Sequence, residues 1–235
     1  MLVESRIHRN VYVRFGGEFS KTHYSNMGRG VGCLSYAVVG SYWRTLDVIK
    51  GMPRNTGKAP TLKQKNQQLQ FALITSFLSW FGNLINVGFR SVSKITTPMN
   101  VAVRYHLAEA VLGVGPNYSI DFSKVKFSVG KLDKPKDFGV ESVAGAKLKF
   151  TWTNSYGNTP FRDGTDMGSF LVYNPAKKEF VTVENVIARS ALTFTLQMPA
   201  DFADDDVYAY MSFNSVITEH LTSESVCKGP VPVIA

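Results

Sequence analysis

Hydrophobic and polar residues follow two different periods along this chain. Between residues 31 and 50, apolar side chains recur in short β-like runs, with Gly40-Ser41 marking a bend or bulge between two of them. From Thr61 onward, apolar residues follow spacings of three, four and seven, which predicts an amphipathic helix. The shared face comprises Leu62, Leu69, Leu73, Phe77, Trp80 and Leu84. Toward Ile85 the helix is apolar on nearly all sides, so we expect it to pack on its own sheet and on a partner.

A second helix is indicated by its end signals. Thr97 suits the N-cap, Pro98 the first helical position and Gly113 the residue after the C-terminus. One face is lined by Met99, Ala102, Val103, His106 and Ala110. The first half of the chain is therefore expected to combine β-strands with two helices.

After Gly115-Pro116 the pattern changes to short β-rich runs separated by turn residues. The predicted strands are Val125–Val129, Lys147–Thr153, Ser169–Tyr173, Phe180–Val183, Leu192–Met198, Val207–Phe213 and Ser225–Cys227. Strands at this spacing without intervening helices predict an antiparallel, immunoglobulin-like sandwich, with Trp152 in its core. Asp204 and Tyr208 have the spacing of a tyrosine corner. The predicted fold class is α+β, with an arm at residues 1–27, a β+α oligomerisation domain at 28–115 and the sandwich at 116–235.

Charge is unevenly distributed between the two halves. Residues 1–115 hold 14 Lys and Arg against 4 Asp and Glu, whereas residues 116–235 hold 12 against 14. A basic half can bind nucleic acid, anionic lipid or an acidic protein, or can simply be solvated. The strongest candidates for an anion contact are Lys58, Lys63 and Lys65, which cluster at the start of the first predicted helix.

The two cysteines, Cys33 and Cys227, show no metal-binding spacing and are expected to be free thiols of a reducing compartment. The basic N-terminus has no apolar signal region, and no apolar stretch approaches the length of a membrane span. We therefore expect no membrane contact.

Catalytic motifs are absent from the sequence. The chain has no phosphate loop, dinucleotide fingerprint, zinc-protease motif or serine-hydrolase elbow. Its four histidines lie apart from one another, and His106 is expected at the edge of the core. The adjacent carboxylates Asp204 to Asp206 point in different directions, which favours an exposed corner over a calcium site. We predict that the protein is not an enzyme and has no catalytic residue, cofactor or metal.

Seven short stretches of the sequence form a distinctive set. They are Gly28-Arg-Gly-Val-Gly, Val39-Gly-Ser-Tyr-Trp-Arg, Met52-Pro, Gln70-Phe-Ala-Leu with Asn86-Val-Gly-Phe, Asn100-Val-Ala-Val-Arg-Tyr and Pro116-Asn-Tyr-Ser-Ile-Asp-Phe-Ser-Lys-Val. This set resembles DUF6266, a family of unknown function from Bacteroidota genomes and their crAss-like phages, from about residue 28 to the end. The last segment is the most specific, because it is long and unusual in composition. The resemblance supplies no catalytic residues, and it implies a virion component of the kind that forms rings between portal and tail.

Two main functions fit these observations. The first is a phage structural protein that is made in the host cytoplasm and forms a homo-oligomeric ring or collar in the neck of the virion. Its expected neighbours are other neck and tail proteins, and indirect contact with packaged DNA is left open. Its predicted interface residues are Val11, Tyr12, Val13, Phe15, Tyr42, Trp43, Arg44, Phe77, Trp80 and Phe81. The alternative is a carbohydrate- or cell-surface-binding module that uses loop aromatics such as Tyr156 and Phe161. Nucleic-acid binding is a third, weaker reading.

Overall fold

The computed structural model describes residues 38–43, 46–51, 57, 59–93, 95–154, 157 and 159–234. The chain divides into two units, residues 1–59 and residues 60–235. In the first unit, β1 (Val38–Trp43) pairs antiparallel with β2 (Leu46–Gly51). The β-structure predicted for this region is confirmed over these strands. Gly40-Ser41 lies inside β1, so the predicted bend between strands is wrong there.

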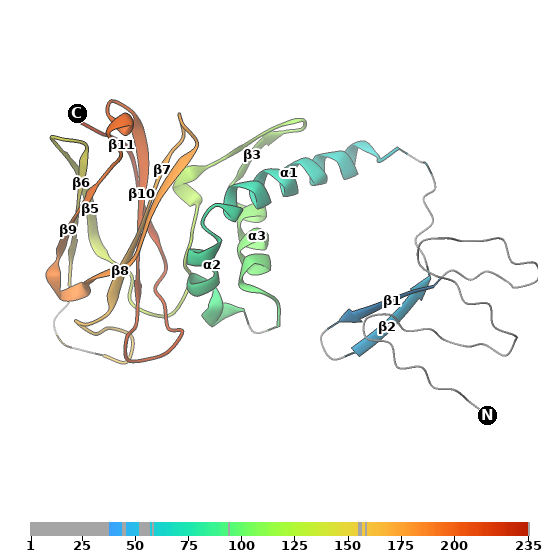
Figure 1. Ribbon diagram of the computed structural model, residues 1–235, viewed down its shortest axis with the longest axis horizontal. Helices are drawn as coiled ribbons and strands as arrows, with labels where there is room; N and C mark the ends of the chain where they lie inside the picture. Colours follow the sequence, from blue (N-terminus) through green and yellow to red (C-terminus); the bar gives the residue numbers. More distant parts are fainter. Residues whose placement is uncertain are drawn as a thin grey trace, which may run out of the picture. The chain divides into compact units, whose positions relative to one another are not determined.

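The second unit contains an antiparallel sandwich of two sheets (Figure 1). One sheet has the order β5-β6-β9 and the other has the order β11-β10-β7-β8. The strands are β5 (Lys136–Val143), β6 (Lys147–Thr153), β7 (Met167–Asn174), β8 (Glu179–Ala188), β9 (Thr193–Gln197), β10 (Asp206–Asn214) and β11 (Val226–Pro232). Three strands facing four, all joined antiparallel, are an immunoglobulin-like arrangement, as predicted.

The space between the sheets is filled by apolar side chains of both sheets, and the side chains of β6 alternate clearly inward and outward. Leu148, Phe150 and Trp152 from β6 are buried and meet Phe170 of the opposite sheet. The Phe150 and Phe170 rings lie 4.8 Å apart. Trp152 also donates its indole N–H to the carbonyl of Arg189 at 2.8 Å, so its one polar atom is satisfied inside the core. The predicted core position of Trp152 is confirmed.

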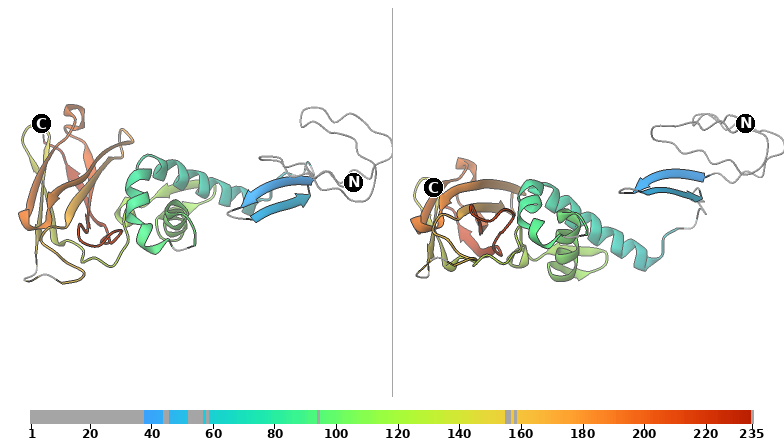
Figure 2. Two further views of the ribbon diagram at one scale, coloured as in Figure 1. Left: turned by 60° about the horizontal axis from the view of Figure 1, so that its bottom comes forward. Right: turned by 90° about the horizontal axis from the view of Figure 1, so that it is seen from below.

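Helices and a β-hairpin cover one side of the sandwich (Figure 2). They are α1 (Leu62–Ser79), α2 (Gly82–Gly88), α3 (Pro98–Glu109) and the hairpin of β3 (Val111–Val114) with β4 (Asn117–Ile120). Short 3₁₀ turns occupy Arg90–Val92, Phe122–Lys124, Arg189–Ala191 and Ala200–Phe202. The predicted helix starts are confirmed. Thr61 caps α1 through a reciprocal capping box with Gln64, and Thr97 caps α3 ahead of Pro98.

Two details of the predicted helices are wrong. The first helix does not continue to Ile85, because it ends at Ser79 and a second helix leaves at 90°. The second helix ends at Glu109 with Ala110 as its C-cap, and Gly113 lies in β3. Gly113 has a positive φ of 99°, which a glycine adopts without strain, so its role is in the hairpin and not at a helix end.

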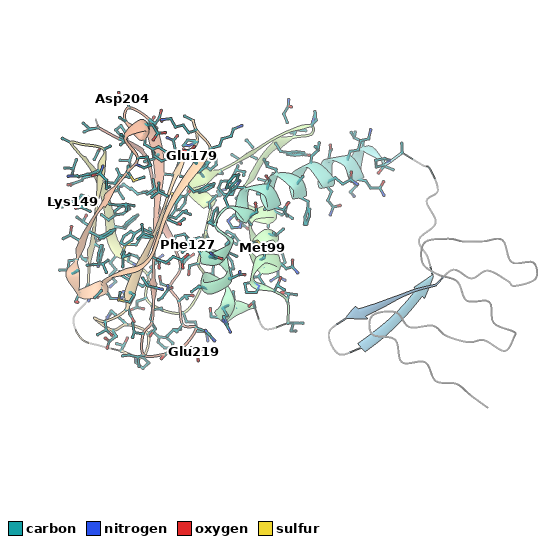
Figure 3. The ribbon with its side chains drawn as sticks, in the orientation of Figure 1. Met99, Phe127, Lys149, Glu179, Asp204 and Glu219 are labelled. Carbon is teal, nitrogen blue, oxygen red and sulfur yellow. The ribbon has the colours of Figure 1, made fainter. Side chains whose placement is uncertain are left out.

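The helices and the sandwich share a second hydrophobic cluster. It combines Phe77, Phe81 and Phe127 with Leu171 and Tyr210 from the sandwich strands. Figure 3 shows Phe127 between the helices and the strands. The boundary predicted at 115/116 is therefore absent, because helices and sandwich belong to one unit that begins at Pro60.

The predictions for residues 116–235 differ from the structure in three further ways. The segment Val125–Val129 is not a strand, although Val125 and Phe127 are buried beneath the helices. β5 and the β3–β4 hairpin were not predicted. Among the hydrogen bonds of the described residues, none joins the Tyr208 hydroxyl to the Asp204 corner, so the tyrosine corner is absent. The Tyr208 ring packs 5.2 Å from Phe122 instead, and it is the buried Tyr210 hydroxyl that donates to the Phe122 carbonyl at 2.6 Å.

Candidate interaction surface

The elbow between α1 and α2 separates two kinds of aromatic side chain. Phe77 and Phe81 turn inward, with their rings 5.5 Å apart, and both meet Phe180 of β8. Trp80, between them in sequence, is the C-cap residue of α1 and is 72% exposed. Phe77 and Phe81 are therefore parts of the core of their own chain, and the prediction that they form an interface with another copy is wrong.

A small groove lies beside the elbow. It has a volume of about 160 Å³ and is lined on one side by residues Ser79 to Leu84. The other side is formed by Thr182 and Glu184, two exposed residues of β8. Ligand pockets usually span about 300–1,000 Å³. This groove is thus of a size for one side chain of a partner and not for a whole metabolite.

The first half of α1 and the β3–β4 hairpin project beyond the sandwich side by side (Figure 1). An added Cβ at Gly115, in the hairpin turn, would lie 2.3 Å from Asn66 Oδ1, so the turn rests closely against α1. Both elements expose large apolar side chains, namely Leu62, Leu69, Phe71, Leu112 and Val114. We call α1 up to Phe71 together with the hairpin the projecting lobe. Exposed apolar groups gathered on adjoining elements are typical of interaction surfaces.

The projecting lobe carries positive charge only. Lys63 and Lys65 lie exposed in the first turns of α1, which has no acidic residue there, and the hairpin contains no charged residue. The third predicted anion contact, Lys58, lies outside the described residues. An anion at this helix end stays a prediction.

Other predicted interface residues fall where no side chain is described. Val11, Tyr12, Val13, Phe15 and Arg44 lie outside the described residues. Tyr42 and Trp43 belong to β1, whose backbone pairing alone is described. Of the aromatics in the binding-module alternative, Tyr156 lies outside the described residues and Phe161 is exposed on a loop.

His106 has a structural role, because both of its ring nitrogens bond to the backbone. Its Nδ1 lies 2.7 Å from the Ala102 carbonyl oxygen, and its Nε2 accepts the backbone N–H of Lys126 at 3.1 Å. One ring nitrogen must donate and the other accept, which is the pattern of a neutral imidazole. Burial lowers the pKa of His106 below its usual 6.5. The sequence predicted His106 at the edge of the core, and this is wrong, because His106 is fully buried inside the core.

Cys227 is a free thiol, partly buried beside Phe122. Burial raises the pKa of its thiol to about 12, so very little thiolate forms near neutral pH. Among the described residues no group of three or more His, Cys, Asp or Glu side chains is arranged to hold a metal ion. Cys33 lies outside the described residues.

No helix of the described residues is long and apolar enough by itself to cross a membrane. Only α1 and α2 taken together, as a bent pair, have the length and composition of a span. The apolar residues of that pair include Ile74, Leu78, Leu84 and Ile85, which are buried in the protein.

Comparison with known families decides the relationship of this chain. The model of a family described as "Family of unknown function (DUF6266)" matches residues 30–226. The chain belongs to the DUF6266 family. The matched range takes in β1 and β2, the helices and all of the sandwich up to the start of β11, so this DUF6266 protein carries the family pattern in both of its units.

Solved structures similar to this DUF6266 protein include fibronectin type III domains. A two-domain segment of chicken tenascin has 16% identity and a TM-score of 0.33, covering 44% of this chain and 51% of that one. A fibronectin type III domain of human collagen alpha-1(XX) has 18% identity and a TM-score of 0.29, covering 44% and 88% respectively. The chain thus spans about half the length of the tenascin segment. The curated proteins include no match to it.

Proposed function

We propose that this DUF6266 protein is a non-enzymatic structural protein that assembles with copies of itself, as a ring or collar in the neck of a tailed phage. The observation that carries the proposal is the projecting lobe. Val114 is 85% exposed, Leu62 75% and Phe71 52%. Burial of apolar area of this kind is the main favourable term in protein association. The virion setting is supported by the sequence resemblance alone.

The absence of enzymatic activity is supported by how two reactive groups of the described residues, His106 and Cys227, are used. His106 has both ring nitrogens engaged with the backbone, and the Cys227 thiol is held in its protonated form. A catalytic base or nucleophile needs a free, accessible atom near a pocket, and neither residue meets that requirement. The sandwich, with its four-stranded and three-stranded sheets, is then a rigid module that presents surfaces.

The test is the oligomeric state of the purified full-length chain. Light scattering and native mass spectrometry over a wide concentration range should show oligomers, and electron microscopy should show closed rings. Phe71→Asp combined with Val114→Asp should weaken assembly, because both side chains are exposed on the projecting lobe. Ile217→Asp is the matched control, since Ile217 is 71% exposed but lies on a sandwich loop. A monomer at every concentration would contradict the proposal.

A further inference from the structure

The outer edge of β8 is open. In the part of the chain that the structure describes, β8 pairs with β7 alone and ends its sheet. It is ten residues long, and a bulge between Val183 and Ile187 interrupts its pairing with β7, so its regular stretch is Glu179 to Val183. The free N–H and C=O groups of an edge strand are a template for one more strand. Natural sheets usually shorten, cover, charge or bulge such an edge, and β8 has both charges and a bulge. Its five regular residues before the bulge leave room for one short added strand whose charge complements that of β8.

One face of β8 leads into the groove at the elbow. Successive residues of a strand point to opposite faces, so Phe180, Thr182 and Glu184 share one face. Phe180 packs against Phe77 and Phe81, and the other two line the groove below Trp80. A Trp ring beside a carboxylate suits a guanidinium group, which stacks on the ring and pairs with the carboxylate.

The other face of β8 is apolar and incompletely covered. Val181, Val183 and Ile187 pack against the sandwich core but stay partly exposed. A strand added at this edge would therefore be stabilised by apolar residues on its sandwich side. On its groove side it would need a long cationic or aromatic residue.

The chain contains one such segment in its own N-terminal region. Val11-Tyr-Val-Arg-Phe15 lies outside the described residues, and its sequence alternates, so that as an added strand it would present the two valines and Phe15 on one face and Tyr12 with Arg14 on the other. Residues 6–15 include three arginines and no acidic residue, whereas β8 carries Glu179 and Glu184. Both the period and the charge of this segment match what the β8 edge requires.

We propose that residues 11–15 of one copy add a strand to the β8 edge of a neighbouring copy, with Arg14 in the groove between Trp80 and Glu184. This inference rests on the proposed function, because it requires two copies to meet. Each copy would offer an arm and accept one, which is a heterologous contact. Repeated head to tail, such a contact generates a closed ring or an open filament.

Charge reversal in the full-length chain tests the contact. Arg14→Glu and Glu184→Arg should each weaken self-association about tenfold or more, by light scattering across a dilution series, and the double variant should recover most of the loss. Trp80→Ala should weaken association as well. Glu141→Arg is the control, because Glu141 is exposed on β5 in the other sheet. Equal effects from Glu141→Arg and Glu184→Arg, or no recovery in the double variant, would overturn the inference.

A disulfide trap identifies the occupant. Tyr12→Cys and Thr182→Cys are introduced together with Cys33→Ser and Cys227→Ala, and unlabelled and ¹⁵N-labelled chains are mixed before oxidation. Disulfide-linked pairs of mixed mass support the inference, and the same trap with Thr195→Cys on β9 should give none. A link within single chains shows that the arm folds back on its own copy and overturns it. Oligomers that form without the disulfide between positions 12 and 182 also overturn the inference, but they leave the proposed function standing. A wild-type chain that stays monomeric refutes the proposed function itself.

Discussion

The hydroxyl of Thr222 donates a 3.1 Å hydrogen bond to the carbonyl oxygen of Gly88, joining the loop before β11 to the last residue of α2. The same oxygen lies 3.0 Å from the backbone nitrogen of Val129 and 3.4 Å from the Ser128 hydroxyl. Donors from two distant segments thus converge on one helix end. A helix C-terminus has carbonyls without partners inside the helix, and here one is used to fix the helices on the sandwich.

Gly88→Ala should therefore destabilise the fold strongly. A Cβ at this position would lie 2.3 Å from the Phe127 carbonyl oxygen and 2.7 Å from the Ser128 Cα, and backbone cannot move aside cheaply. We expect a loss of about 3 kcal/mol in the free energy of unfolding, measured by urea denaturation. Gly164→Ala is the control, since its nearest new neighbour lies at 3.7 Å. Similar losses in both variants would contradict the proposed clash.

Arg189 and Asp166 form a buried ion pair whose disruption should be costly. Arg189 Nε lies 3.0 Å from Asp166 Oδ2, and the guanidinium also donates to the Asp133 carbonyl at 2.8 Å and lies 3.9 Å from the centre of the Phe213 ring. Arg189→Met leaves a buried carboxylate without its partner, which should cost about 3–5 kcal/mol in chemical denaturation. Adding Asp166→Asn should recover part of the loss. Asp201→Asn is the control, because the ion pair that it breaks with Lys177, at 3.6 Å, is exposed to solvent and should contribute little to stability.

Truncating Phe77 should lower the stability of the chain strongly, whereas truncating Trp80 should hardly change it. Phe77 is 8% exposed and contacts the Phe122, Tyr173 and Phe180 rings, so Phe77→Ala should cost about 3–5 kcal/mol of stability. Trp80→Ala should change the stability of the dilute chain by less than about 0.5 kcal/mol. Thermal and urea unfolding at low protein concentration measure both. A large loss for Trp80→Ala would show that this ring is already used within its own chain.

Acid should weaken the fold through His106. Burial lowers its pKa, and the neighbouring Lys126 charge acts in the same direction, so the unfolded chain binds this proton more readily than the folded chain. The contribution of neutral His106 to the free energy of unfolding is therefore fully present above pH 6.5. It is lost as the pH falls below 6.5 toward the pKa of His106 in the folded state. Denaturation at pH 7.5, 6.5 and 5.5 should show this decline.

The control for this pH effect is His106→Gln, which removes the titrating group. The variant should be less stable at pH 7.5, because it loses the paired backbone contacts, but its stability should vary less between pH 7.5 and 5.5. Asp163 and Asp205 have lowered pKa values and titrate below this range, so they do not confuse the comparison. If the stability of His106→Gln falls with pH as steeply as that of the wild-type chain, another group causes the decline.

The parts of this fold that the sequence predicted are those determined by local signals. β6 spans the predicted Lys147–Thr153, because alternation alone places its apolar residues inward. Thr61 and Thr97 mark helix starts, because capping depends on residues within one turn. These features need no knowledge of distant contacts.

The features that the sequence did not predict depend on distant contacts. Apolar periodicity continues across Trp80 and Phe81, and the elbow follows from packing of Phe81 on Phe180. β5 has a mixed burial pattern without clear alternation, so its pairing with β6 is the only sign of it. The groove joins residues 79–84 to Thr182 and Glu184, which lie far away in sequence. The sequence predicted Trp80 as an interface residue on the apolar face of the helix, but Glu184 carried no signal at all.

The attachment of α2 to the sandwich also has a mechanical consequence. Here tension arriving from residue 60 would enter through α1 and pass to the strands across the Gly88 carbonyl and the cluster around Phe127. The first sandwich strand, β5, would be shielded from that pull. Unfolding under force is governed by the unfolding rate, so the contacts of α2 and not the pairing of β5 would determine how this unit resists tension from that side.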